Sequence, residues 1–411
     1  MKVSAQACPC GPGVRWTLGG FAALICLAVA GAGAGGAETA TAPPPGLYVR
    51  DGVLMKDGRP YRGVGANYFS LFSRMIKDPA DTSSLANLKA LSQAGIPFVR
   101  FMCGGFWPAE QKLYLQDREE YFRRLDQVVR CAEANRIGLV PSLFWYFATV
   151  PDAVGEPLDQ LGNPQSKSIA LIRRYTSQVV ERYKDSPAIW GWEFGNEYNL
   201  DADLPNHPTH RPPVVPQLGT PKERTQRDEL KFPQIRTAFV AFAETARKFD
   251  RTRIIVSGNA IPRPSAWHNV HEKTWTADTE AQFGEILLRD NPDPMNTICV
   301  HVYRDAKGVY PGEAKSIDEV IGLAAKHAAR AGKPLFLGEF GAQRQLGPRE
   351  KQQAVFEEFL GAIEKHRVPL AAFWVFDFDG QREDWSVSFG GDRSFMIDLV
   401  SQLNARLRRQ G

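Results

Sequence analysis

The amino-acid sequence predicts an α/β fold, a (β/α)8 TIM barrel with a short N-terminal β-hairpin. From residue 61 onward, strand-like apolar runs alternate with helix-length amphipathic segments, and eight of each can be counted. A doubly wound open sheet would need a glycine-rich phosphate turn after its first strand, and none is present there. The expected strands are 61–68, 96–102, 137–145, 188–196, 253–257, 297–303, 334–339 and 370–376.

The other elements follow from local patterns. The turn signals Asp51-Gly52 and Asp57-Gly58 separate short runs before residue 61, which predicts a small β cap ahead of the barrel. Three long connections follow strands three, four and five, so they belong to the carboxyl face, where barrels of this type carry their sites. These connections are 147–165, 200–232 and 260–296. The clearest helices are expected at 121–135, 167–183, 234–249, 317–331 and 351–366, with a closing helix from about residue 395.

The first 46 residues are expected to lie outside the barrel. Lys2 and Arg15 precede an apolar stretch at 18–34, and small residues at 35–37 suit signal-peptidase cleavage, so residues 1–37 are predicted to be a signal peptide. Residues 38–46 form a proline-rich linker, and the folded domain covers 47–411. We expect a secreted or periplasmic protein without stable membrane insertion once the leader is removed. The alternative is a membrane anchor, because the apolar stretch approaches roughly 18 residues.

Composition bounds the possible partners. The 411 residues are 43% hydrophobic and 23% charged, which is typical of a globular protein with a large core. The formal charge of +4 becomes 4 − 2 = +2 without Lys2 and Arg15, and no basic run carries interleaved aromatic residues. Nucleic acid is therefore not an expected partner. Cys103, Cys131 and Cys299 remain after the leader, so at most one disulfide can form within a chain. We expect a monomer without a cofactor.

Two glutamates stand in unusual positions. Glu197 closes the run Trp-Glu-Phe-Gly-Asn-Glu at 192–197, and Glu339 lies inside Leu-Phe-Leu-Gly-Glu-Phe-Gly at 335–341. Burying a carboxylate at the end of an apolar strand is costly unless it has a partner or a use. Two carboxylates brought face to face are what the hydrolysis of a glycosidic bond requires, one to protonate the leaving oxygen and one to attack or to activate water.

Other polar residues join these two at the ends of strands. Because strand side chains alternate, His301 and Tyr303 are expected to enter the site together from strand six. Glu193 shares the parity of Glu197 but should lie deeper, where it needs a buried partner such as Arg100 on strand two. Arg100 could serve only to neutralise Glu193 or could belong to the site, and both interpretations stay open.

Tryptophan rings can stack on the apolar C–H face of a pyranose. We expect Trp374, Trp145 and Trp107 to bind sugar in this way, and we leave Trp267, Trp275 and Trp385 open. Asp377 and Asp379 could cap a loop or contact substrate.

No metal site is expected. His207 and His210, like His268 and His271, have metal-like spacing, but neither pair has a carboxylate-rich partner, so solvated loop histidines are predicted.

Taken together, these residues resemble those of family 5 of the clan A glycoside hydrolases, in particular the secreted bacterial β-mannanases and cellulases. The resemblance extends from residue 47 to the C-terminus. In that family an Asn-Glu pair ends strand four, a His-x-Tyr ends strand six, a Glu ends strand seven, a Trp ends strand eight and an Arg lies on strand two. The counterparts here are Asn196 with Glu197, His301 with Tyr303, Glu339, Trp374 and Arg100.

The resemblance implies a role for each residue. Glu197 would be the acid/base and Glu339 the nucleophile. Asn196 would hydrogen-bond the sugar 2-hydroxyl, and His301 would support the acid/base and the sugar. Tyr303 and Arg100 would keep the nucleophile ionised, and Trp374 would form the floor of the subsite.

The expected activity is retaining hydrolysis of β-glycosidic bonds in a polysaccharide, a mannan or a β-glucan, by a double displacement. Many cellulase-type members carry a histidine near the end of strand three, where this chain has Leu-Phe-Trp-Tyr at 143–146, which is more similar to the mannanase-like branch. The alternatives are an exo-acting β-glycosidase and a non-catalytic carbohydrate-binding barrel. A metal-dependent barrel hydrolase would need ligands at several strand ends, whereas only His301 among the seven histidines ends a strand.

Overall fold

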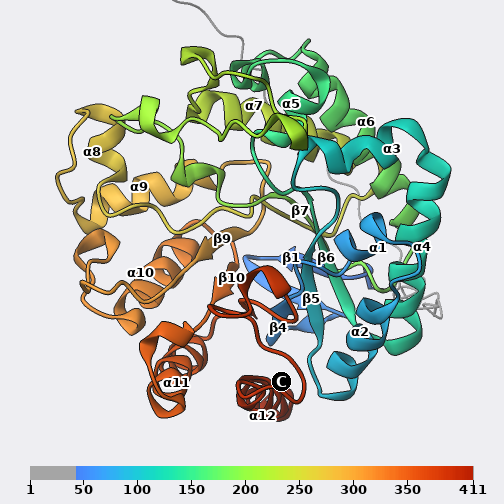
Figure 1. Cartoon of the computed structure of the whole chain (residues 1–411). Helices are drawn as coiled ribbons and strands as arrows, with labels where there is room; N and C mark the ends of the chain where they lie inside the picture. Colours follow the sequence, from blue (N-terminus) through green and yellow to red (C-terminus); the bar gives the residue numbers. More distant parts are fainter. Residues whose placement is uncertain (1–42, 411) are drawn as a thin grey trace, which may run out of the picture. The chain divides into compact units, whose positions relative to one another are not determined.

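The computed structural model describes residues 43–410, and within them an N-terminal sheet precedes a barrel (Figure 1). The sheet has three antiparallel strands, β1 (Leu47–Arg50), β2 (Val53–Lys56) and β3 (Arg59–Pro60). The predicted hairpin is thus extended by a third short strand. Asp51 and Asp57 take positive φ values of 50° in the two turns, which aspartate tolerates better than most residues.

The predicted eight-stranded parallel barrel is confirmed. Its strands are β4 (Gly63–Asn67), β5 (Phe98–Met102), β6 (Gly138–Phe144), β7 (Gly191–Gly195), β8 (Ile254–Val256), β9 (Ile298–His301), β10 (Leu335–Phe340) and β11 (Leu370–Phe373). They pair in the order β8-β7-β6-β5-β4-β11-β10-β9. A parallel bridge between Val256 and Thr297 joins the two edge strands, so the barrel closes.

Helices form an outer ring around these strands (Figure 1). They are α1 (Ser73–Lys77), α2 (Ser83–Gln93), α3 (Lys112–Gln116), α4 (Arg118–Asn135), α5 (Thr149–Val154), α6 (Lys167–Tyr183), α7 (Phe232–Phe249), α8 (Ala266–His271), α9 (Glu280–Asp290), α10 (Ile317–Arg330), α11 (Arg349–Lys365) and α12 (Phe395–Gln410). Side-chain caps fix several starts: Asp117, Ser166 and Ser316 accept from backbone N–H groups of α4, α6 and α10. Each predicted helix is present, with ends within three residues of the expectation.

The N-terminal sheet closes the amino end of the barrel. The backbone N–H of Leu47 donates to Trp190 O just before β7, and Tyr48 bridges Arg253 just before β8. Leu47 and Leu54 pack with Phe98, the Trp190 ring and other apolar residues of the barrel floor in a buried cluster separate from the main core. A site inside the barrel must therefore open at the carboxyl end.

The long connections on the carboxyl face contain more regular structure than the sequence suggested. Residues 147–165 include α5, and 260–296 include α8 and α9, so α9 supplies the helix between β8 and β9. Residues 200–231 contain only short 3-10 turns, and α7 begins at Phe232. Thr279 and Gln282 form a capping box at the start of α9.

Two remaining expectations concern the compartment. Cys103, Cys131 and Cys299 are all free thiols. None of the helices between residues 43 and 410 is both long enough and apolar enough to cross a membrane. The predicted signal peptide and the first part of the linker lie outside the described residues, so the leader stays a prediction.

Candidate active site

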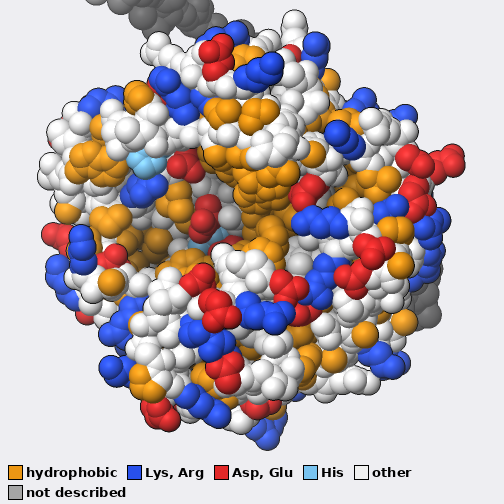
Figure 2. Space-filling view, viewed as in Figure 1, with side chains coloured by type: hydrophobic (Ala, Val, Ile, Leu, Met, Phe, Trp, Pro, Cys, Tyr) orange, Lys and Arg blue, Asp and Glu red, His pale blue; other side chains and the backbone are white. Residues whose placement is uncertain are grey.

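A cavity of about 490 Å³ opens where the barrel strands end. Figure 2 shows the hollow at the centre of this face, with acidic side chains inside it and hydrophobic side chains along one wall. Six of the predicted site residues line it, namely Trp145, Asn196, Glu197, Tyr303, Glu339 and Trp374. They come from the ends of β6, β7, β9, β10 and β11. The cavity is therefore built from residues far apart in the sequence.

Glu197 sits on a strained turn directly after β7. Its φ of 54° lies in the left-handed region, which costs energy for a residue with a side chain and is found where surrounding structure fixes the backbone. Here its N–H donates to Gly258 O at 2.8 Å. Gly258 approaches so closely, at φ +75°, that a Cβ there would lie 1.8 Å from Gly195 O. The turn aims the carboxylate into the cavity, where 28% of the side chain is exposed.

The surroundings of Glu197 favour a protonated carboxyl. Burial raises its pKa to about 7, and Arg100 and Arg263 oppose that rise only in part. His301 Nδ1 lies 3.0 Å from Glu197 Oε1. Burial lowers the pKa of His301 to about 3, so this imidazole is neutral and its bond to Glu197 adds no cation. When Glu197 is protonated, its hydroxyl can donate to Nδ1. When Glu197 is ionised, an N–H at Nδ1 donates to the carboxylate.

Glu339 has a different environment. Arg100 Nη1 donates to its Oε1 at 2.7 Å, and the Tyr303 hydroxyl donates to its Oε2 at 2.6 Å. The preceding residue must be small, because a Cβ at Gly338 would lie 2.8 Å from His301 Nε2. One oxygen of Glu339, one of Glu197 and one nitrogen of His301 all lie within 4.8 Å of one another.

Arg100 serves both purposes that the sequence left open. It is fully buried, and its Nε donates to both oxygens of Glu193, at 2.7 and 2.9 Å. Its other nitrogens reach Glu339 and Asn196 Oδ1, the latter at 2.8 Å. Burial works against its charge, yet the neighbouring carboxylates raise its pKa above the usual value. One guanidinium therefore neutralises the deep carboxylate and organises the cavity above it.

Aromatic rings form the walls of the cavity. Trp145 and Trp374 lie nearly parallel with centroids 6.1 Å apart, and the Arg100 guanidinium lies over Trp145 at 4.5 Å. Trp107 does not line the cavity. Its ring contacts Phe106 and Tyr146 instead, and Phe106 faces the cavity in its place.

Several lining residues were missed or left open by the sequence. Those missed are Phe69, Phe106, Phe378, Gly380 and Gln381, and Trp385 was left open. All of them lie beyond strand ends, so strand parity could not find them. The one usable signal was composition, because aromatic residues are dense just after the first and last strands.

Asp377, also left open, caps a loop. Its Oδ2 accepts from the Tyr68 hydroxyl at 3.0 Å and from Asn87 Nδ2 at 2.7 Å, and it forms an ion pair with Arg74. Asp379 is more exposed and pairs with Arg74 and Arg382.

The cluster of Glu197, His301 and Glu339 has the composition of a metal site, but its surroundings are unfavourable for a cation. Both Glu339 oxygens already accept short bonds from Arg100 and Tyr303, and a buried guanidinium beside the cluster repels a cation. Among the described residues this is the one group of three close enough to act as ligands. The loop histidines form ordinary pairs, as His268 does with Asp278 at 2.7 Å.

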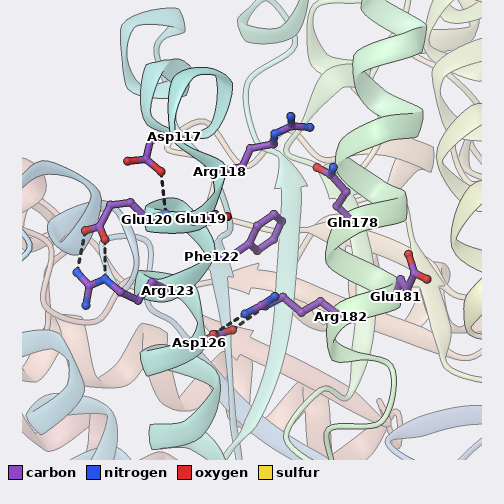
Figure 3. A pocket seen from close by; sticks show the side chains of 10 residues that line it. All are labelled: Asp117, Arg118, Glu119, Glu120, Phe122, Arg123, Asp126, Gln178, Glu181 and Arg182. Carbon is purple, nitrogen blue, oxygen red and sulfur yellow. Dashed lines mark hydrogen bonds and ion pairs between the residues drawn. The ribbon is translucent and has the colours of Figure 1, made fainter.

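A larger groove of about 860 Å³ lies on the surface between α4 and α6 (Figure 3). Four of its charged side chains are engaged with one another. Arg182 pairs with Asp126, and Arg123 pairs with Glu120. The groove holds a single aromatic residue, Phe122, and arginine partners lower the pKa values of its carboxylates Glu120 and Asp126. These carboxylates are therefore poor proton donors, and the chemistry points to the barrel cavity.

Comparison with known proteins agrees with this geometry. The family model described as cellulase (glycosyl hydrolase family 5) matches residues 61–378. A probable mannan endo-1,4-beta-mannosidase F of Aspergillus flavus is 31% identical over 163 residues, which cover 34% of this chain and 34% of that protein. The chain thus matches about a third of that relative's length.

Solved structures share the fold at low identity. The endo-1,4-beta-mannanase of Rhizomucor miehei superposes with a TM-score of 0.63 at 18% identity, covering 89% of this chain and 99% of that one. A family 5 mannosidase of the same organism gives 0.61 at 13% identity, with the same coverage. These likenesses support the barrel, and the family match spans most of the chain. The chain therefore belongs to the cellulase family of glycoside hydrolases, family 5.

Proposed function

We propose that this protein hydrolyses the β-glycosidic bonds of a polysaccharide with retention of anomeric configuration, using Glu197 as acid/base and Glu339 as nucleophile. The observation that carries the proposal is the pair itself, with carboxylate oxygens within 4.8 Å of each other. Retaining enzymes hold their carboxyl groups about 5 Å apart, whereas inverting enzymes need roughly 6.5 to 9.5 Å to admit a water molecule.

The environments of the two carboxyls support their separate roles. Glu197, with a pKa near 7, can carry a proton to the leaving oxygen in the first step. Glu339 accepts hydrogen bonds from Arg100 and Tyr303, which orient its oxygens for attack on the anomeric carbon. In the second step Glu197 takes a proton from water, the water oxygen attacks the anomeric carbon, and Glu339 leaves.

Neighbouring residues would position the sugar. Arg100 donates to Asn196 Oδ1, which leaves the Asn196 amide nitrogen to donate to a sugar 2-hydroxyl. Trp374 and Trp145 line the cavity and bring apolar ring surface to it. His301 hydrogen-bonds to Glu197, and because its imidazole is neutral, it places no positive charge beside the acid.

A mannan or a β-glucan is the proposed substrate. The departure from the cellulase-like histidine at 143–146 and the partial match to a probable mannan endo-1,4-beta-mannosidase both favour mannan. Exo-action is the second candidate, because Phe69 closes part of the wall. Its ring contacts those of Trp145 and Phe378 with centroids 5.1 and 4.6 Å apart, which leaves no slot for a sugar between them.

A polysaccharide panel tests the proposal. The enzyme should release sugar fastest from mannan, glucomannan or a β-glucan and slowest from xylan, and NMR should show the β-anomer as the first product. An α-anomer appearing first would rule out retention. Mixed oligomers early in the reaction indicate internal cleavage, whereas a single short product indicates exo-action.

The raised pKa of Glu197 predicts the alkaline limb of the activity profile. Because the protonated carboxyl is the donor, kcat/KM should fall about tenfold per pH unit above pH 7. The matched control is Glu197→Gln assayed with a dinitrophenyl glycoside, whose leaving group departs without a proton. Its kcat/KM should show no limb near pH 7, and a limb that persisted unchanged would mean that another group is the acid.

A further inference from the structure

Gln381 lines the cavity together with Glu197 and Glu339, although it follows β11 by eight residues. Its Oε1 accepts a hydrogen bond from Trp374 Nε1 at 2.7 Å. Its backbone carbonyl accepts from the N–H groups of Trp385 and Ser386, each at 2.9 Å. One residue thus fixes the Trp374 indole through its side chain and anchors Trp385 through its main chain.

The segment that carries Gln381 is held firmly against the barrel. Asp377, in the left-handed region at φ 48°, accepts from Tyr68 and Asn87 and forms an ion pair with Arg74. The Phe378 N–H donates to the Ser386 hydroxyl at 3.0 Å. The position of Gln381 is therefore set before any ligand arrives, which lowers the entropic cost of a contact.

The amide oxygen of Gln381 has a hydrogen-bond partner, whereas its amide nitrogen is left to bind a ligand. Its oxygen is bound to the indole, so its Nε2 points away from Trp374 and keeps two N–H donors. No acceptor for this nitrogen exists among residues 43–410, and the residue faces the cavity. A donor displayed beside an aromatic ring suits a sugar, which offers hydroxyl oxygens around the edge of the ring that it stacks.

We propose that Gln381 is a substrate-binding and specificity-determining residue, whose Nε2 donates to a hydroxyl of the sugar unit stacked on Trp374. The inference rests on the proposed function and deepens it. A site built to hydrogen-bond a hydroxyl discriminates strongly against a sugar that lacks one there, because the donor is then left unpaired. Gln381 thereby links the orientation of the ring to the choice of sugar.

Three substitutions separate binding from ring orientation. Gln381→Met keeps the length but removes donor and acceptor. Gln381→Glu keeps an acceptor for the indole but loses the donor. Trp374→Phe keeps a ring but removes the indole N–H. Gln353→Met is the matched control, because Gln353 is partly exposed on α11 and its side chain bonds only to Glu357.

The experiment measures calorimetric binding of β-1,4-mannotriose and cellotriose in the non-hydrolysing Glu339→Gln background, together with kcat/KM in the otherwise wild-type enzyme. Gln381→Met and Gln381→Glu should both weaken binding of the preferred trisaccharide about five- to fifteenfold, as one lost hydrogen bond implies. Both substitutions should reduce the ratio between the affinities for the two trisaccharides. Gln353→Met should change neither the affinity for the preferred trisaccharide nor this ratio.

The double variant decides the mechanism. In a Trp374→Phe background, Gln381→Met should still weaken binding about fivefold, because its partner is the sugar. If that effect vanished, or if Gln381→Glu bound as wild type does, Gln381 would act only by orienting Trp374 and the inference would be wrong. A Glu339→Gln protein that bound neither trisaccharide, with a wild type that cleaved neither, would instead overturn the proposed function and this inference with it.

Discussion

Replacing Glu339 by alanine is expected to lower kcat on polysaccharide by at least about 10⁴-fold, or roughly 5.5 kcal/mol of transition-state stabilisation. The substitution removes the only carboxylate that the cavity places to attack the anomeric carbon. Folding should survive, because the buried Arg100 keeps its contact with Glu193 when Glu339 is removed. Steady-state kinetics on the preferred polysaccharide measures the loss.

Azide separates a missing nucleophile from a damaged site. In Glu339→Ala it can occupy the vacated space and attack directly, giving an α-glycosyl azide, whereas the wild type gives only β-configured sugar. Thermal unfolding should confirm a folded variant. A folded Glu339→Ala enzyme that cleaved an activated β-glycoside at the wild-type rate would disprove the nucleophile assignment.

The barrel and the ends of its strands could be predicted because both depend on local patterns. Buried parallel strands are continuous apolar runs, and a polar residue ending such a run stands out, as Glu339 and His301 do. The pairing of Arg100 with Glu193 also followed from strand parity and the cost of an unpaired buried charge. The structure bears out these contacts.

The cavity walls could not be predicted, because loops build them. Phe69, Phe378 and Gln381 follow strand ends in segments without a fixed period, and their convergence depends on long-range contacts such as those of Asp377. Trp107 illustrates the limit. Both Phe106 and Trp107 contact Tyr146, but only Phe106 lines the cavity, and no local signal in the sequence distinguishes the two neighbours.

Arg100→Met is expected to lower the free energy of unfolding by about 3 to 5 kcal/mol, more than the other substitutions proposed above. It leaves Glu193 buried with no cation, and removes donors from Glu339 and Asn196. Burial raises the pKa of Glu193, and the loss of Arg100 leaves that rise unopposed. A carboxyl group with a higher pKa in the folded state than in the unfolded state destabilises the fold more and more as the pH rises from the unfolded-state pKa to the folded-state pKa. The loss in the free energy of unfolding should therefore be greater at pH 8 than at pH 5.

A second substitution distinguishes charge from packing. Arg100→Met combined with Glu193→Gln removes the stranded carboxylate, so urea denaturation at pH 8 should recover part of the lost stability. Activity should not return, because Glu339 still lacks its guanidinium donor. Glu193→Gln alone is the control: it keeps the Arg100–Glu339 pair and should keep most of the activity.

If Arg100→Met unfolded at the wild-type urea concentration, the buried charges would not be coupled as the distances imply. If the double variant regained full activity, Arg100 would act solely as the counter-ion of Glu193, and the arginine would have no part in the cavity above it.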